Sequence, residues 1–378
     1  MLWLYDPFTL LALILAYAIG FVALMSIAGY IAPRVAWRFA GRFTLRASML
    51  IVGLLIVVSG LAGLILIIYS LASVAGFDVV LTSGFIVSLA LFLLIANLIS
   101  YLLSPFLINL MYGAKPDEHL QEIVNEVSAR LGLSKPPKAV IVNSPPNAFA
   151  YGSIISGRYV AVSRELAEML SRDELEAVIG HELGHHLHRD NAIMLFMGLL
   201  PSLIYFMGVF LIRAGLISST ARLSSRRREG ASGGLLLLLV GVAAVVLSFV
   251  IQVLVLAFSR LREYYADTSG ASASSPRSMQ RALAKLHVYY EGFAYAREVI
   301  STSKIKALFI YALTEAVANP LYHYGMPSRR VDWSHIDIDE VIEELKKKEV
   351  SSIQEYLSTH PPTPKRLRFL DKLRLGEW

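Results

Sequence analysis

Five long stretches without a charged side chain constrain this chain more than any other feature of its sequence. They cover residues 8–32, 49–75, 82–111, 192–212 and 235–258. A helix of about 20 apolar residues is long enough to cross the hydrocarbon core of a bilayer. Hydrophobic residues make up 55% of the chain and charged residues only 17%, and the mean hydropathy is +0.56. We therefore expect a membrane protein with three transmembrane helices in residues 1–112 and a transmembrane helical hairpin over residues 192–258.

Arginines beside the apolar stretches predict the topology. Four of them, Arg34, Arg38, Arg42 and Arg46, follow the first stretch, and loops rich in arginine stay on the cytoplasmic side. This places the N-terminus outside and everything after residue 112 inside, apart from the hairpin. The loop of the hairpin carries four more arginines (222, 226, 227 and 228), which a full crossing would leave outside. We favour a full crossing, because earlier helices have by then fixed the orientation.

A His-Glu-x-x-His box lies in the segment between the third and fourth apolar stretches. Its two histidines, His181 and His185, project from one face of a helix and can bind one metal ion. Glu182 lies about 100° round the helix from His181, where it can act as a general base on water. Ser171 and Glu174 predict a capping box at the start of this helix. The chain has no cysteine, so disulfides and thiolate ligands are excluded, and we expect one zinc ion held by His, Asp or Glu.

Two further histidines follow the box. His188 shares the ligand face but lies roughly 10 Å from His181 along the helix axis, which is too far for the same metal ion. His186 points away from that face. Both are expected to be solvated or to support the ligands.

Glu263 is the best candidate for the third ligand that a catalytic zinc site needs. It follows the hairpin, on the same side of the membrane as the histidines. Asp267 shares its helix face and could accept a proton from the ring N–H of a ligating histidine. In the alternative interpretation, Glu263 and Asp267 pair with Arg260 and Arg262 on a solvated helix face.

Three motifs in this order resemble the HtpX-like membrane metallopeptidases, which are related to the CAAX prenyl proteases. The motifs are residues 181–185, 259–267 and 359–366, and the resemblance runs from about Asp117 to the C-terminus. It implies that His181, His185 and Glu263 bind zinc and that Glu182 is the general base. One departure is that HtpX proteins usually have two spans before the catalytic domain, whereas three are predicted here.

Three other residues are candidates for contact with substrate. Asn147 begins residues 147–152, which look like the family's substrate-binding edge segment; it could bind the substrate backbone or simply form a turn after two prolines. His360 could stabilise an oxyanion or be an ordinary loop histidine. Arg366 ends the third motif and is the third candidate.

The expected fold is mainly α-helical, with multi-pass transmembrane helices and a cytosolic α+β zincin domain of the gluzincin type that contains a small sheet. That catalytic domain is divided into residues 113–191 and 259–378 by the hairpin. Its expected helices are 118–131, 163–170, 172–188, 276–290, 305–317, 337–348 and one beginning at Thr363, and its expected strands are 139–142, 147–152 and 159–162.

The predicted function is that of a zinc metalloendopeptidase in the cell membrane, which cleaves membrane or misfolded proteins at the cytosolic face. Its expected partners are polypeptide substrates and the lipid bilayer. Nucleic acid is excluded, because no basic motif rich in aromatic residues is present. The alternatives are a CAAX-type prenyl protease, for which five spans are few, and a catalytically silent zinc-binding membrane scaffold. A transporter is disfavoured, because no span carries a charge near its middle.

Overall fold

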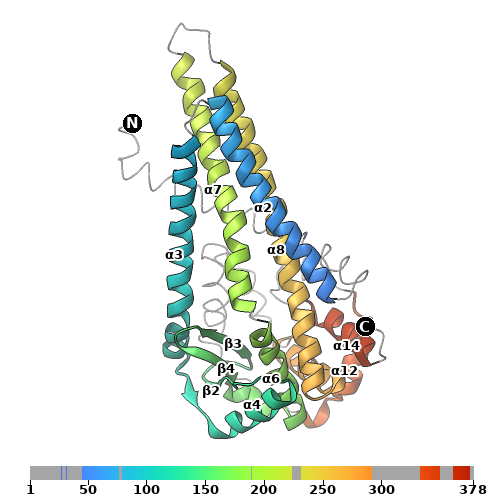
Figure 1. Cartoon of the computed structure of the whole chain (residues 1–378). Helices are drawn as coiled ribbons and strands as arrows, with labels where there is room; N and C mark the ends of the chain where they lie inside the picture. The colour runs from blue at the N-terminus through green and yellow to red at the C-terminus, as the bar shows by residue number, and fades with distance from the viewer. Residues whose placement is uncertain are drawn as a thin grey trace. The chain divides into compact units, whose positions relative to one another are not determined.

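The computed structural model of this chain is mostly helical (Figure 1). It describes residues 45–75, 79–188, 190–223, 231–291, 333–349 and 361–374, together with Ile27 and Ile31. Most of the first apolar stretch, the helix expected at 305–317 and the candidate His360 lie outside the described residues.

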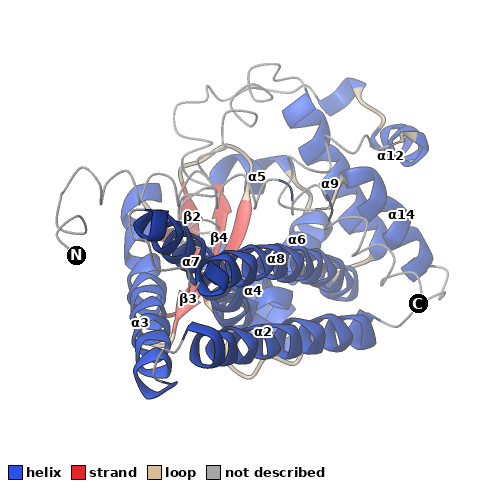
Figure 2. Ribbon diagram, turned by 90° about the horizontal axis from the view of Figure 1, so that it is seen from above, coloured by secondary structure: helices blue, strands red, loops and turns tan. Residues whose placement is uncertain are grey.

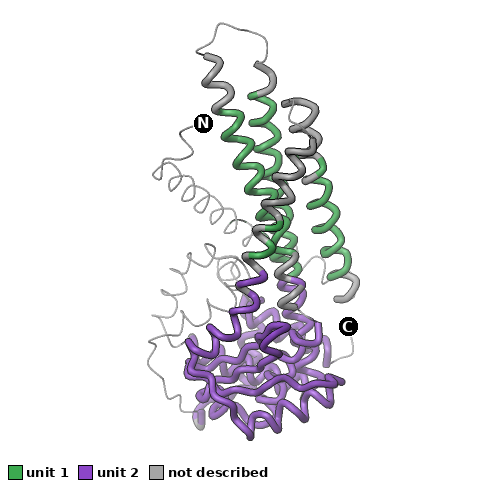
Figure 3. Tube along the Cα trace, turned by 60° about the vertical axis from the view of Figure 1, so that its left-hand side comes forward, with its two compact units in different colours: residues 1–36, 49–97, 195–258 green, residues 37–48, 98–194, 259–378 purple. Residues whose placement is uncertain are grey.

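The chain divides into two compact units (Figure 3). The first comprises residues 1–36, 49–97 and 195–258 and holds most of the apolar sequence. The second comprises residues 37–48, 98–194 and 259–378 and holds the His-Glu-x-x-His box.

Four of the apolar stretches lie in long helices: α2 (Leu45–Ala75), α3 (Val79–Tyr112), α7 (Asp190–Leu223) and α8 (Ala231–Ala273). Within the described residues, two segments are long and apolar enough to cross a membrane, Met197–Leu216 in α7 and Gly234–Ala273 in α8. These two helices approach closely, since a Cβ on Gly208 would lie 2.8 Å from the carbonyl oxygen of Gly241. The prediction of three spans before residue 113 remains a prediction.

A four-stranded mixed sheet lies in the second unit (Figure 2). Its strands are β1 (Lys115–Pro116), β2 (Lys138–Val142), β3 (Ala148–Ser153) and β4 (Gly157–Ser163), in the order β1-β2-β4-β3. β2 is parallel to β4, whereas β3 and β4, which correspond to two of the expected strands, form an antiparallel hairpin with Ala148 opposite Val162. Gly157 has a φ of +84° at the turn, a conformation that favours glycine. β3 is therefore an edge strand among the described residues.

Both faces of this sheet are covered, because alternate side chains of a strand point in opposite directions. On one face, Ala139 and Val160 pack with helices α4 (Glu118–Arg130), α5 (Arg164–Met169) and α6 (Arg172–Leu187). On the other face, Val140 and Ala161 pack against Ile108 at the C-terminal end of α3. Helix α6, which carries the His-Glu-x-x-His box of residues 181–185, thus packs on one face of the sheet.

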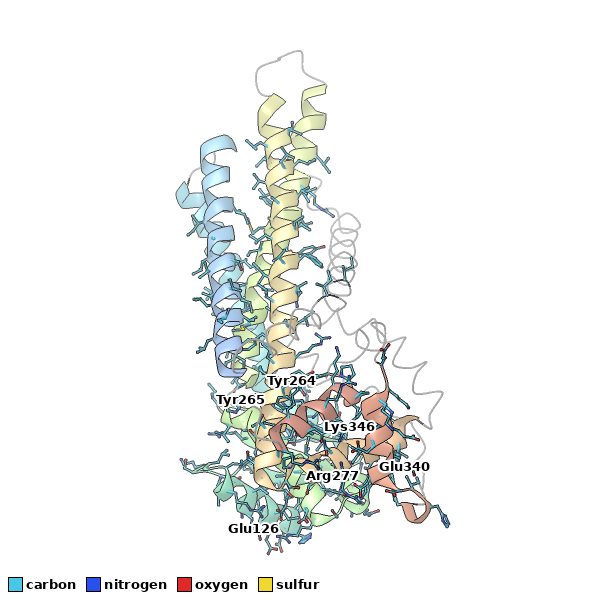
Figure 4. All side chains as sticks on the ribbon, turned by 90° about the vertical axis from the view of Figure 1, so that its right-hand side faces the viewer. Glu126, Tyr264, Tyr265, Arg277, Glu340 and Lys346 are labelled. Atoms are coloured by element: carbon cyan, nitrogen blue, oxygen red, sulfur yellow. The ribbon has the colours of Figure 1, made fainter. Side chains whose placement is uncertain are left out.

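Helices α9 (Pro276–Glu291), α12 (Ile338–Lys347) and α14 (Thr363–Arg374) complete the second unit, with a 3₁₀ turn at Trp333–His335. Ion pairs connect them, and Figure 4 labels Arg277 on α9 and Lys346 on α12. Arg277 pairs with Asp339 at 2.9 Å, and Lys346 pairs with Asp371 of α14 at 2.6 Å. These contacts hold α14, which carries Arg366, beside the other two helices.

Helix α6 begins with the predicted capping box. The Ser171 side chain accepts a hydrogen bond from the Glu174 N–H, and the Glu174 carboxylate accepts one from the Ser171 N–H at 2.9 Å. The same buried carboxylate also accepts from Lys285 at 2.6 Å and Arg281 at 3.1 Å, both on α9. Burial by itself would raise the pKa of Glu174, but these cations and the backbone N–H lower it below its usual value of 4.5.

Replacing Glu174 with Gln should lower the free energy of unfolding by roughly 3 kcal/mol, because Lys285 would lose its buried anion. Glutamine keeps an oxygen for the Ser171 N–H, so the change isolates the ion pairs. The stabilisation by Glu174 is complete above pH 4.5 and is lost as the pH falls through the lower pKa of the folded state.

Thermal unfolding of the purified protein at neutral pH and below pH 4.5 would test this. The stability difference between wild type and Glu174→Gln should narrow at acid pH. The matched control is Glu122→Gln, whose side chain is 76% exposed. An equal effect of both variants would contradict the assignment.

Candidate metal centre

Three side chains with metal-binding atoms converge between helices α6 and α8. They are His181 and His185 of α6 and Glu263 of α8, and their ligand atoms lie within 4.8 Å of one another. The Nε2 atoms of the two histidines are each 3.7 Å from a different oxygen of the Glu263 carboxylate. The structure therefore brings together the three residues expected to bind the metal ion.

These donors suit zinc. Zinc bonds to imidazole nitrogen and carboxylate oxygen are about 2.0–2.2 Å long and roughly tetrahedral, so neighbouring ligand atoms lie about 3.4 Å apart. The observed 3.7 Å is close to that spacing. The side chains of His181 and Glu263 are 6% and 4% exposed, whereas that of His185 is 13% exposed, so the centre is more open at His185.

Asp267 fixes the orientation of His181. Its Oδ1 lies 2.9 Å from Nδ1 of the imidazole, so Nδ1 carries the proton and Nε2 is left with a lone pair that faces Glu263 and His185. Nη2 of Arg366 is 3.4 Å from the same Nδ1. Nη2 of Arg366 and the protonated Nδ1 of His181 are both donors and cannot bond to each other. We therefore assign the hydrogen bond of Nδ1 to the carboxylate of Asp267.

Arg366 holds Asp267 in turn. Its Nε donates to Oδ2 of Asp267 at 2.8 Å and its Nη2 donates to Oδ1, so the pair is bidentate. Burial alone would raise the pKa of the Asp267 carboxyl, but the guanidinium and His181 lower it below its usual range. Arg366, one of the three candidates for contact with substrate, is thus buried and paired with Asp267, the acid that contacts His181.

The two acids of α8 do not lie on a solvated helix face. Glu263 is 3% exposed and Asp267 is fully buried, and the bidentate partner of Asp267 comes from α14 rather than from α8. A charged group buried this deeply is stable only with a compensating charge or a metal ion. The alternative interpretation, in which both acids lie on a solvated helix face, is therefore wrong.

Glycines allow α6 and α8 to approach closely enough to form the centre. A Cβ on Gly184 would lie 2.9 Å from Cβ of Ser269 and 3.1 Å from Cα of Ala266, and a Cβ on Gly180 would overlap Cβ of Ala273. Gly180 and Gly184 were not recognised from the sequence as part of the centre. Their spacing, with three residues between Gly180 and Gly184, was the signal, because small residues four apart let helix backbones meet.

Glu182 and the two histidines that follow the box lie in different surroundings, and the expectation that His186 is solvated or supports the ligands is wrong, because its side chain is buried against β4. Glu182 is buried on α6, next to the first histidine. Nε2 of His186 is 2.8 Å from the carbonyl oxygen of Tyr159 on β4, on another side of the helix. The His188 ring lies 4.2 Å, centroid to centroid, from the ring of Tyr265, which Figure 4 labels on α8.

Asn147 precedes the edge strand β3. Its backbone forms two hydrogen bonds with Ser163, N–H to Oγ at 2.9 Å and carbonyl oxygen to N–H at 2.8 Å. Tyr290 of α9 donates to the carbonyl oxygen of Pro146 at 2.7 Å, which also holds this loop. Within the described part of the chain, the side-chain amide of Asn147 has no hydrogen-bond partner and can bind a ligand.

Replacing Gly184 with Ala should weaken metal binding, because the added methyl group would separate α6 from α8. Overpacking of this kind costs about 1–3 kcal/mol, or roughly ten- to hundredfold in affinity. Competition with a chromogenic chelator would measure the zinc affinity. Adding Ser269→Gly to the same variant removes the closest contact and should restore part of the affinity. Unchanged affinity in Gly184→Ala would show that the close approach is not required.

Comparison with known proteins finds a family model and several similar proteins. A family model described as Peptidase family M48 matches residues 114–374. The Protease HtpX homologs of Pyrobaculum islandicum and Archaeoglobus fulgidus are 50% and 48% identical to this chain; the first alignment covers 95% of this chain and 96% of the relative, and the second 99% of each. The homolog of Aeropyrum pernix is 39% identical over 78% of this chain and 89% of its own.

A solved structure, that of S. mikatae Ste24p, is 16% identical to this chain, with a TM-score of 0.38, over 86% of this chain and 66% of that one. Similarity at that level carries no weight for either the fold or the activity. The resemblance to HtpX proteases expected from the three motifs is confirmed by the relatives and by the family model. On both findings, the chain belongs to peptidase family M48.

Proposed function

We propose that this protein is a zinc metalloendopeptidase that crosses the cell membrane several times and cleaves membrane or unfolded proteins at the cytosolic face. The observation that carries the proposal is the convergence of His181, His185 and Glu263 beside the buried Glu182. Two histidines and a carboxylate leave one position of a tetrahedral zinc ion open, as catalysis requires. A purely structural zinc site would use four protein ligands.

In the proposed layout, residues 1–112 form a membrane domain with three spans, and residues 192–258 form a transmembrane hairpin. The two parts of the catalytic domain, 113–191 and 259–378, lie on the cytosolic side. The supporting observations are the uncharged runs and the arginines that follow the first of them. The family match over residues 114–374 is consistent with a catalytic domain in these segments.

The chemistry is divided between the metal ion and Glu182. When bound, zinc acts as a Lewis acid that polarises the scissile carbonyl and acidifies water. The carboxylate of Glu182 takes a proton from the attacking water and later gives that proton to the leaving amine. Glu182 directly follows His181 on α6, and its side chain is buried.

Asp267 and Arg366 act through His181. The carboxylate of Asp267 keeps the proton of the imidazole on Nδ1, so Nε2 remains available as a ligand. Arg366 neutralises Asp267 and fixes both of its oxygens. We therefore assign Arg366 a positioning role in place of the substrate contact that the motif suggested.

Substrate is proposed to bind as an extended strand along β3. This strand is at the edge of the sheet among the described residues, and edge strands present unpaired backbone groups to a partner chain. β3 also packs against α6, which carries the zinc box. The free amide of Asn147 at the start of β3 is suited to a hydrogen bond with the substrate backbone.

Glu182→Gln should abolish hydrolysis and keep about one zinc ion per chain, because glutamine cannot accept the proton and is not a proposed ligand. By general acid–base reasoning the loss is about 10²–10⁴-fold or more. The assay uses purified wild type and variant with zinc restored, and follows fragments of an unfolded model protein together with bound zinc.

The other outcomes of this assay separate the alternatives. Equal activity of variant and wild type would reject Glu182 as the base. Zinc bound by both proteins with no cleavage by either would favour the silent scaffold, unless wild type cleaves a prenylated peptide, which would favour the CAAX-type protease. If neither protein binds zinc, the assembled centre is wrong.

Arg366→Met should lower zinc affinity by about 10–100-fold, because Asp267 would lose its partner and hold His181 less firmly. Arg366→Lys keeps the charge without the planar fork and should recover only part of the affinity. Arg368→Met, on the same helix, removes a guanidinium that donates to the carbonyl oxygen of Lys346 instead. That control should bind zinc as wild type does; a substrate-binding role for Arg366 would change KM and leave zinc affinity unaltered.

A further inference from the structure

The turn of the β3–β4 hairpin exposes two large apolar side chains. Ile154 is 81% exposed and Ile155 is 77% exposed. Among the described residues outside α2, α3, α7 and α8, the other large apolar side chains are mostly covered, apart from Ile27 in the first apolar stretch and Leu187 at 40%. Two adjacent exposed isoleucines in water would be costly, so this turn is suited to an apolar partner.

The hairpin lies along the C-terminal half of α3, as Figures 1 and 2 both show. Phe149 packs on Tyr112 with ring centroids 5.0 Å apart, the Tyr151 hydroxyl donates to Asn109, and the backbone of Ile154 lies near the Tyr101 hydroxyl. The hairpin therefore runs antiparallel to α3, from the end of the helix back toward its middle. Tyr101 and Tyr112 are eleven positions apart, which is about 16 Å along a helix.

This part of α3 is itself apolar and exposed. It belongs to the uncharged run of residues 82–111, and its exposed side chains include Leu103 at 51%, Phe106 at 67% and Leu110 at 69%. The isoleucines of the turn thus lie beside a helix surface with the composition of a membrane span. Both surfaces belong to the same compact unit.

The part of the hairpin next to the turn has the composition of a membrane interface. Tyr151 and Tyr159 stack with ring centroids 5.0 Å apart, and Nζ of Lys138 lies 5.2 Å from the centre of the Tyr159 ring. Arg158 and Lys138 are exposed. Tyrosines and basic residues next to an apolar tip match the boundary between acyl chains and anionic headgroups.

We propose that the β3–β4 turn, Ile154–Ile155, inserts into the leaflet of the bilayer that faces the catalytic unit. This inference rests on the proposed function, in which α3 spans the membrane. It gives the substrate a route: β3 packs against α6, which carries the His-Glu-x-x-His box, and its turn would lie in lipid, so a chain that leaves the bilayer would meet β3, the edge strand among the described residues.

The absence of cysteine makes the test direct, because each introduced cysteine is the only thiol. Ile155→Cys, Leu103→Cys and Glu122→Cys are labelled with an environment-sensitive fluorophore. Each full-length protein is reconstituted in phosphatidylcholine–phosphatidylglycerol vesicles with nitroxide-labelled lipid. We expect loss of fluorescence through the nitroxide lipid at 155 and 103 but not at 122, and loss through aqueous iodide at 122 alone.

Two results would overturn the proposal in different ways. If position 103 is quenched by the lipid and position 155 behaves like 122, the turn lies in water and only this inference fails. If 103 and 155 are both exposed to iodide, the membrane premise for α3 fails as well. The zinc centre and the role of Glu182 are tested separately by the hydrolysis assay.

A second measurement tests the route to β3. The double variant Ile154→Asp with Ile155→Asp should lose cleavage of a bilayer-anchored substrate and keep cleavage of a soluble unfolded protein. Replacing both isoleucines with leucine is the matched control and should retain both activities. Equal loss on both substrates, with helical content unchanged by circular dichroism, would contradict the route.

Discussion

The catalytic unit depends on the close approach of α6 to α8. Gly180 and Gly184 bring the two backbones near enough for Glu263 to lie 3.7 Å from both ligating histidines. Larger side chains there would leave two histidines on one helix and a carboxylate out of reach on another. The approach has to be fixed before metal binding, because a zinc ion tolerates only a small range of ligand distances. The sheet and α4 hold α6 from its other sides, so small residues at one helix crossing determine whether the centre exists.

Buried charged side chains orient the residues of the centre. Glu263 and Asp267 are four residues apart on α8, and both are almost fully buried. Arg366 from α14 compensates Asp267, and Glu263 lies with His181 and His185 in the group that could hold a metal ion. A buried ion pair is weak evidence of stability, because desolvation offsets much of its attraction. Its function here is orientation: it fixes the tautomer of His181 and connects the C-terminal helix to the zinc helix over a long separation in sequence.

Local patterns in the sequence predicted most of the described elements, whereas contacts between distant segments were predicted less well. The capping box at Ser171 and the helices α4, α5 and α6 beside the sheet are set by neighbouring residues, so they could be recognised before the fold was known. The contact of Arg366 with Asp267 could not be predicted, because no residue in the helix of Arg366 indicates where its guanidinium points. Glu263 was intermediate, since spacing alone left it either a ligand or one half of a surface ion pair. Its burial argues against the surface ion pair, and its role as a ligand remains a proposal.

The long apolar helices were also predicted from local sequence patterns. Their length exceeds the thickness of the hydrocarbon core, so it must be explained how they would fit a bilayer. Helix α3 has 34 residues, about 51 Å at 1.5 Å per residue, whereas the hydrocarbon core is only about 30 Å thick. Part of the helix must therefore tilt or extend beyond the core. Its C-terminal end packs on one face of the sheet while its outward side chains stay apolar, so the end is half inside the domain and half suited to lipid. If α3 spans the bilayer, as proposed, the packing of its C-terminal end on the sheet would hold the catalytic unit next to the membrane without a flexible linker. The proposed substrate strand β3, which packs on the same part of α3, would then lie close to the lipid boundary.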